Sequence, residues 1–320
     1  MRTSVVIRTK DEARRLRLTL TSLSVQTEPL QVVVVNDGST DDTREVVREA
    51  AAWLDLIRID HAVARGRSAA SNAGARAAAG DLLIFLDGDT LAGPQMVERH
   101  RTAHATPNVA GRGETFHVRT TRLLRDPETL EPWPGEECAL AERPREELER
   151  MRITRDAILH DFSSIERRAS PGIYPGSGAR RVYELEMDAL DHHPDSTVLW
   201  AAASGSNFSV ERTAFLEAGG FLEELDLNEH RELALRLYAL GLRLVPVHGA
   251  RTYHMIHGVT RNPLDERAWE ETFYRAHPLP VVRLLPVLWA SLAPDSTVPA
   301  DQRIFTLPEL EAAAARLERC

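Results

Sequence analysis

The chain has 320 residues, 43% of them hydrophobic and 27% charged, which is enough for one large or two modest domains with a sizeable core. Its 48 acidic residues outnumber its 39 basic ones, and the formal net charge of -9 argues against a nucleic-acid-binding surface. Two cysteines, Cys138 and Cys320, are too few for a disulfide framework or a zinc site and indicate a reducing compartment.

The N-terminus runs directly into a predicted strand and lacks the apolar core and cleavage site of a signal peptide. A membrane span needs ~20 apolar residues, and the nearest run, residues 281–293, is shorter and contains Arg283. We therefore expect a cytoplasmic protein with no transmembrane segment, in which residues 281–293 are available for a peripheral contact with a membrane.

Strands and helices alternate through the first part of the chain. Apolar runs at residues 4–7 and 31–35 predict buried strands, each followed by a polar loop and a helical pattern of apolar residues. A third unit begins at residues 56–59, and the apolar run 82–86 predicts a central strand buried on both faces. This alternation predicts a Rossmann-like α/β fold, a mainly parallel sheet with helices on both faces.

Two carboxylates follow the strand predicted over residues 82–86. Asp87 and Asp89 bracket a glycine at the carboxyl edge of the sheet, where open α/β folds bind their ligands. We expect both side chains to converge on one hard divalent cation, Mg²⁺ or Mn²⁺. An ordinary acidic turn is the alternative.

Four segments in order resemble successive signatures of family 2 glycosyltransferases of the GT-A fold. They are VVIRTKDE at residues 5–12, VVVNDGSTDDT at 33–43, GRSAASNAG at 66–74 and GDLLIFLDGD at 80–89. The resemblance implies an enzyme that takes a sugar from a nucleoside-diphosphate sugar donor.

The resemblance also implies roles for individual residues. Thr9 and Glu12 of the first loop line the nucleotide pocket, and Asp37 accepts hydrogen bonds from the base. Asp87 and Asp89 hold the divalent ion, Mn²⁺ or Mg²⁺, on the diphosphate, and Asp87 also belongs to the donor site.

Three positions depart from the family pattern. Arg8 and Lys10 replace a proline and a tyrosine, and Ser71 replaces an arginine. Arg65, Arg67 or Lys10 supplies the missing positive charge, unless these residues are only a solvated loop. We include Arg8 and Arg67 in the predicted donor site.

The resemblance returns at residues 204–221 and continues to a predicted helix that ends near Gly241. Asp226 and Glu229 predict a capping box at its start. The family usually has Glu-Asp here, and its aspartate is commonly the base that deprotonates the acceptor; this chain has Glu229 and His230. Either residue is a candidate base, because histidine titrates near neutrality. Alternatively, Glu229 caps the helix and His230 is exposed.

Histidines follow a predicted edge strand at residues 242–247. The family often places a histidine here that completes the metal site, and His254 is in the expected place, with His257 as the second candidate.

We divide the chain into three parts: residues 1–110 bind the nucleotide sugar, 111–260 bind the acceptor and include an insertion at 112–199, and 261–320 form a helical C-terminal extension. Within the insertion, residues 144–162 predict one charged helix. The Gly/Pro/Ser-rich segment around Tyr174 is either a lid that orders when the donor binds or a plain surface loop.

The resemblance implies an inverting, metal-dependent transferase. Processive members of the family usually carry a Gln-x-x-Arg-Trp motif and membrane helices, and neither is found in this sequence, so we expect the transfer of a single sugar. The acceptor class stays open: a small metabolite, a glycan or a peptide. Two alternatives remain. One is an aspartyl phosphatase, but the signature of that class has its residues in a different order from Asp87-Gly-Asp89. The other is a non-catalytic nucleotide-sugar-binding protein on a decayed transferase fold, which Ser71 and His230 support.

Overall fold

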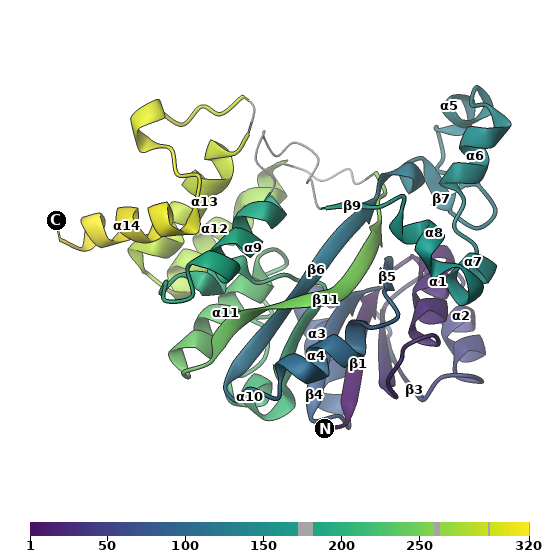
Figure 1. The fold of residues 1–320 in the computed structure, drawn as a ribbon, viewed down its shortest axis with the longest axis horizontal. Coiled ribbons are helices and arrows are strands. Elements are labelled where there is room, and N and C mark those ends of the chain that lie inside the picture. Colours follow the sequence, from purple (N-terminus) through teal and green to yellow (C-terminus); the bar gives the residue numbers. More distant parts are fainter. Residues whose placement is uncertain (172–181, 259–262, 294, 320) are drawn as a thin grey trace.

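The computed structural model describes residues 1–171, 182–258, 263–293 and 295–319 (Figure 1). The strands are β1 Thr3–Thr9, β2 Gln31–Asp37, β3 Leu56–His61, β4 Leu82–Asp87, β5 Thr90–Ala92, β6 Val109–Val118, β7 Leu124–Asp126, β8 Glu131–Pro132, β9 Ser170–Pro171, β10 Phe208–Glu211 and β11 Arg243–Met255. The α-helices are α1 Ala13–Leu23, α2 Thr43–Ala50, α3 Arg67–Ala77, α4 Met96–Ala103, α5 Glu137–Ala141, α6 Arg145–Met151, α7 Arg155–His160, α8 Phe162–Glu166, α9 Val182–His192, α10 Arg212–Glu217, α11 Glu229–Ala239, α12 Pro263–Ala276, α13 Pro280–Ser291 and α14 Leu307–Glu318.

One mixed sheet runs through the molecule in the order β3-β2-β1-β4-β10-β6-β11-β5, with β9 paired to β6 (Figure 1). Strands β3, β2, β1 and β4 are parallel, as predicted. Side chains alternate across this half: Val5 and Ile7 pack with α1 and α2, whereas Val6 packs with α3 on the opposite face. The predicted α/β fold with helices on both faces is confirmed.

Strand β10 joins the two halves of the sheet, because it lies between β4 and β6 and is antiparallel to both. Strand β6 spans the expected boundary between residues 110 and 111 and pairs with β11 in parallel. Asn207, just before β10, is fully buried, and its amide donates to the carbonyls of Glu114 and Ala250 at 3.0 and 2.6 Å. These bonds hold the irregular part of β11, where the register with β6 shifts between Val247 and Arg251.

The insertion differs from its prediction. Residues 144–162 do not form one helix; α6 and α7 lie in this stretch, α8 begins at its end, and Thr154 caps α7 by accepting a hydrogen bond from the Ala157 amide at 3.0 Å. This N-cap interrupts the helical pattern that the sequence shows. Tyr174 and the segment around it lie outside the described residues.

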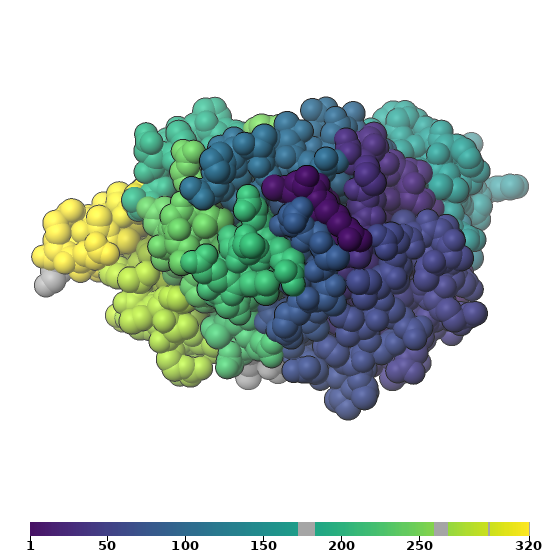
Figure 2. Space-filling model, turned by 90° about the horizontal axis from the view of Figure 1, so that it is seen from below, coloured from purple at the N-terminus to yellow at the C-terminus, as the bar shows by residue number. Residues whose placement is uncertain are grey.

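The C-terminal part is helical, as predicted, and Figure 2 shows its last residues (yellow) projecting from one end while the first residues (purple) cross the middle of that face. The apolar run 281–293 falls largely in α13, whose Val282, Leu285 and Leu288 are buried in the core. Among the described residues, no helix has the length and apolar character needed to cross a membrane.

A buried arginine ties α1 to the end of β11. Arg15 is 2% exposed, and its guanidinium donates to four backbone carbonyls: those of Thr121 at 3.3 Å, Leu124 at 2.5 Å, Ile256 at 3.4 Å and Met255. Burial lowers the pKa of Arg15 to about 10, which leaves it protonated at neutral pH. One side chain therefore satisfies carbonyls from two segments more than a hundred residues apart.

Replacing Arg15 with leucine is expected to lower the free energy of unfolding by about 2–4 kcal/mol, because several buried carbonyls would lose their donor. Urea denaturation measures this loss. The matched control is Arg17→Leu on the same helix, which removes only a surface pair with Glu49 at 3.4 Å and is expected to cost less than about 1 kcal/mol. Equal losses in the two variants would contradict the role given to Arg15.

Candidate active site

The two carboxylates after β4 have different partners. Asp87 is the last residue of β4 and lies opposite Arg8 in the β1 register, so its carboxylate turns to that arginine. Asp89 precedes β5, which pairs with β11 and brings His254 opposite Thr90. Both carboxylates are predicted to hold one cation; Asp87 pairs with Arg8, and Asp89 lies beside His254 and His257.

Asp89, His254 and His257 form a cluster that could hold a metal ion. Asp89 Oδ2 lies 3.0 Å from His254 Nε2 and 2.9 Å from His257 Nε2, and the three candidate ligand atoms lie within 4.8 Å of one another. Burial alone would raise the pKa of Asp89, but His254 and His257 hold it well below its usual range. One carboxylate and two imidazoles are a donor set that fits a divalent transition metal such as Mn²⁺.

Arg8 links Asp87 to the start of α11. Its Nε donates to Asp87 Oδ1 at 3.1 Å and its Nη1 donates to Glu229 Oε1 at 2.7 Å. Burial alone would lower the pKa of Arg8, but the two carboxylates raise it above its usual value, so the side chain is a permanent cation. The predicted donor-site residue thus contacts the predicted catalytic one directly.

Glu229 and His230 are both in the interior, so the reading with an exposed His230 is wrong. Burial alone would raise the pKa of Glu229, but Arg8 and then His230 hold it well below its usual range. Burial and the neighbouring Arg231 lower the pKa of His230, which is therefore neutral at pH 7. Its Nε2 accepts a hydrogen bond from Arg231 at 2.6 Å, and its Nδ1 lies 3.6 Å from Glu229 Oε2.

The predicted capping box of Asp226 with Glu229 is also wrong. The residue before α11 is Asn228, in the left-handed conformation with φ of 62°, and its side chain makes no capping bond. Asp226 instead accepts a hydrogen bond from the amide of Arg67 at 3.2 Å, at the start of α3. Its carboxylate therefore joins the two halves of the chain, because it caps a helix that begins 159 residues earlier.

The remaining predicted donor-site residues lie along the same edge. Thr9 is buried and its hydroxyl has no hydrogen-bond partner among the described residues. Burial, and then the charges of Asp89 and Asp87, raise the pKa of Glu12 well above its usual value. Arg67, whose charge acts on Glu12 in the opposite direction, is exposed.

Asp37 is already engaged within the protein. Its carboxylate accepts from the amides of Arg65 at 2.8 Å and Gly66 at 3.0 Å, and lies 2.7 Å from His61 Nδ1. In this structure Asp37 therefore fixes the turn that enters α3.

Sequence reasoning missed a buried ion network behind α11. Glu186 binds Arg231 at 2.6 Å and also pairs with Arg112, and Arg231 lies 4.4 Å from the ring centroid of Trp289. These residues come from distant parts of the chain, and no motif marks them. The network fixes Arg231 and, through it, the ring of His230.

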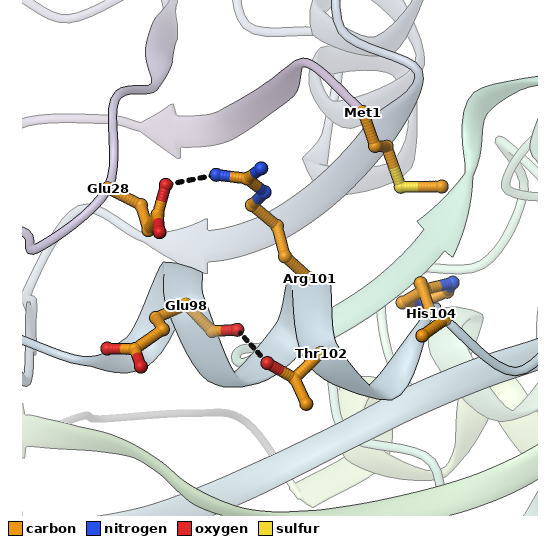
Figure 3. Close-up of a pocket in the computed structure, with 7 residues that line it drawn as sticks. Met1, Glu28, Glu98, Arg101, Thr102 and His104 are labelled. Carbon is orange, nitrogen blue, oxygen red and sulfur yellow. Dashed lines mark hydrogen bonds and ion pairs between the residues drawn. The ribbon is translucent and has the colours of Figure 1, made fainter.

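Two of the cavities among the described residues lie beside the sheet. A cavity of about 210 Å³ adjoins the metal cluster and is lined by Lys10, Glu12, Arg125, Trp133 and His257, among others. A cavity of about 350 Å³ lies at the amino end of β1, where Arg101 pairs with Glu28 beside Met1 (Figure 3). The length of β1 separates this second cavity from the metal cluster, and we assign no role to it.

Comparisons with known proteins agree with this architecture. The chain superimposes on residues 1–349 of TarS from S. aureus with a TM-score of 0.57 and 15% identity, covering 100% of this chain and 83% of that one. A mannosyltransferase from Pyrobaculum calidifontis, in complex with GDP-Man and Mn²⁺, gives a TM-score of 0.51 with 18% identity over 100% of this chain and 75% of that one. The fold is thus that of GT-A glycosyltransferases.

The family model for glycosyl transferase family 2 matches residues 4–160, and this part of the chain belongs to that family. Validoxylamine A glucosyltransferase from Streptomyces hygroscopicus subsp. jinggangensis is 45% identical over 111 residues, 32% of this chain and 26% of that protein. Glycosyltransferase AglE from Haloferax volcanii is 35% identical over 100 residues, 30% of this chain and 33% of that protein. The chain thus matches about a quarter to a third of the length of these relatives.

Asp89→Asn and His254→Ala are expected to weaken Mn²⁺ binding at least about tenfold, because each removes one of three ligands. Titration calorimetry with the metal alone measures this affinity. His248→Ala is the control, since His248 pairs with Asp191 at 2.8 Å and lies outside the cluster. Unchanged affinity in Asp89→Asn would exclude this metal site.

Proposed function

We propose that the protein is an inverting, metal-dependent glycosyltransferase that moves a single sugar from a nucleoside-diphosphate sugar to an acceptor. The observation that carries the proposal is that the Asp89, His254 and His257 cluster lies at the same sheet edge as the Asp87, Arg8 and Glu229 ion pairs. Sugar transfer needs a place for the donor diphosphate and a base that deprotonates the acceptor, close to each other.

In this proposal Asp89, His254 and His257 hold the metal ion, which when bound would neutralise charge on the departing diphosphate. Thr9, Glu12, Asp37 and Arg67 line the donor site with Arg8. The acceptor is a small metabolite, a glycan or a peptide, and the reducing, cytoplasmic location expected from the sequence is part of the same proposal.

Glu229 is the base that we favour. Its Oε1 binds Arg8, whereas its Oε2 is 3.6 Å from His230 and can accept a proton from an incoming hydroxyl. His230 is the weaker candidate, because its Nε2 lone pair already accepts from Arg231. We assign His230 the task of orienting the Glu229 carboxylate.

The relatives and neighbours suggest which donors to test first. TarS has been crystallised with UDP and with UDP-GlcNAc, the Pyrobaculum enzyme with GDP-Man, and the Streptomyces relative is named a glucosyltransferase. The test panel is therefore UDP, GDP, UDP-glucose, UDP-GlcNAc and GDP-mannose, each with and without Mn²⁺.

Thermal unfolding of the wild-type protein with this panel tests the proposal. A ligand at 100 times its Kd adds about 2.7 kcal/mol and is expected to raise Tm by several degrees. A rise in Tm that needs both Mn²⁺ and one kind of nucleotide supports a metal-dependent donor site and identifies the nucleobase of the donor. No rise with any member of the panel would contradict the proposal, and binding without transfer would favour a non-catalytic protein.

Paired variants separate the two candidate bases. Glu229→Gln is expected to lower the rate of sugar transfer or of donor hydrolysis at least about a hundredfold with the donor still bound, because the proton acceptor is lost. His230→Ala is expected to have a smaller effect, about tenfold. A larger loss in His230→Ala than in Glu229→Gln would assign the base to His230, and full activity in both would exclude both.

A further inference from the structure

Arg8 is shared between the donor side and the acceptor side of the site. Its side chain is 12% exposed and binds Asp87 with Nε and Glu229 with Nη1. Asp87 is 36% exposed and Glu229 only 3%. The three side chains thus form a line from the open edge of the sheet to the buried start of α11, over 221 residues of sequence.

Two nitrogens of the Arg8 guanidinium are engaged, and the third is Nη2. Among the described residues Nη2 has no hydrogen-bond partner, and it is not one of the buried polar atoms that lack one. A side-chain carbon at Gly205 would lie 3.6 Å from Nη2 and 3.0 Å from His230 Nδ1. Glycine at position 205 therefore keeps a side chain away from Nη2 and from the His230 ring.

The charges around Arg8 are unbalanced. One guanidinium serves two carboxylates, and Glu12 and Asp89 lie along the same edge. A diphosphate that enters this edge adds further negative charge, and a planar guanidinium offers two parallel N–H donors to phosphate oxygens. Arg8 is then the buried cation that both the donor and Glu229 require.

We propose that Arg8 couples the two half-sites: its Nη2 edge binds a diphosphate oxygen of the donor, and this contact weakens the bond between Nη1 and Glu229. The inference rests on the proposed function and adds a role for Arg8. Glu229 is restrained by Arg8 when the donor is absent and is released toward the acceptor when the donor is present. Since coupling between two sites is reciprocal, the charge of Glu229 opposes donor binding through Arg8.

A double-mutant cycle on nucleotide affinity tests this coupling without any acceptor. Calorimetry with Mn²⁺ and the nucleoside diphosphate selected by the panel gives Kd for the wild type, Arg8→Gln, Glu229→Gln and the double variant. Arg8→Gln is expected to weaken binding about tenfold or more. Glu229→Gln is expected to tighten binding severalfold in the wild-type background and by less than about twofold in the Arg8→Gln background.

Two further variants keep the result interpretable. Arg8→Lys retains the positive charge beside Asp87 but lacks the fork, so it is expected to fold and to lose the coupling. Glu232→Gln is the matched control for Glu229→Gln, since Glu232 is buried on the same helix and pairs with Arg236 at 2.5 Å instead. It is expected to leave Kd unchanged in both backgrounds.

Lys10 supplies an independent report on occupancy of the site. It is the single lysine in the chain, and it lines the cavity beside His257. Reductive methylation with ¹³C-formaldehyde labels this lysine and the N-terminal amine, and the lysine signal is expected to shift when the nucleotide binds.

The possible outcomes are distinct. If the wild type shows neither heat nor a shifted lysine signal with any nucleotide, the proposed function fails and the role of Arg8 fails with it. If the wild type binds and the effect of Glu229→Gln is the same in both backgrounds, the donor site stands and the coupling through Arg8 is overturned. A cycle that is non-additive by about threefold or more, with Glu232→Gln additive, supports the coupling.

Discussion

The guanidinium of Arg15 decides where β11 ends, and the candidate metal cluster follows from that position. By donating to the carbonyls of Met255 and Ile256, it holds the backbone between His254 and His257 against α1. The same helix follows the loop that carries Glu12. The buried Arg15 thus sets the distance between the first loop and β11. As a result the imidazoles of His254 and His257 reach Asp89.

Electrostatics at this edge is arranged around a shortage of positive charge. Asp87, Asp89 and Glu229 lie along it with Glu12, and among the described residues Arg8 pairs with Asp87 and Glu229 while His254 and His257 pair with Asp89. In a buried setting such charges keep fixed positions because solvent cannot rearrange around them. A cationic ligand at Asp89 and an anionic ligand at Arg8 are therefore complementary. Each ligand offsets the charge of the other at this edge of the sheet and so favours its binding.

The parts that the sequence predicts well are those encoded locally. The apolar runs at residues 4–7, 31–35 and 82–86 predicted strands correctly. The family resemblance, rather than any spacing, associated His254 with Asp89, and the two side chains lie 3.0 Å apart. Local patterns fail where a helix cap interrupts them or where the partner is a distant residue. Thr154 divides a predicted helix, and Asp226 was assigned to its own helix although the partner that it caps is Arg67. The bond from Arg8 to Glu229 joins the end of β1 to the start of α11, 221 residues later, which no spacing in the sequence encodes.

The position of β10 has a consequence for synthesis on the ribosome. Until Glu211 has been added, β4 has no neighbour on one side, although β1 to β4 are complete more than a hundred residues earlier. The early part of the chain then carries a buried-type strand with an open edge, which is a ready template for pairing with another chain. The nascent chain is therefore protected against aggregation at this edge only after the four-residue strand β10 has been synthesised and pairs with β4.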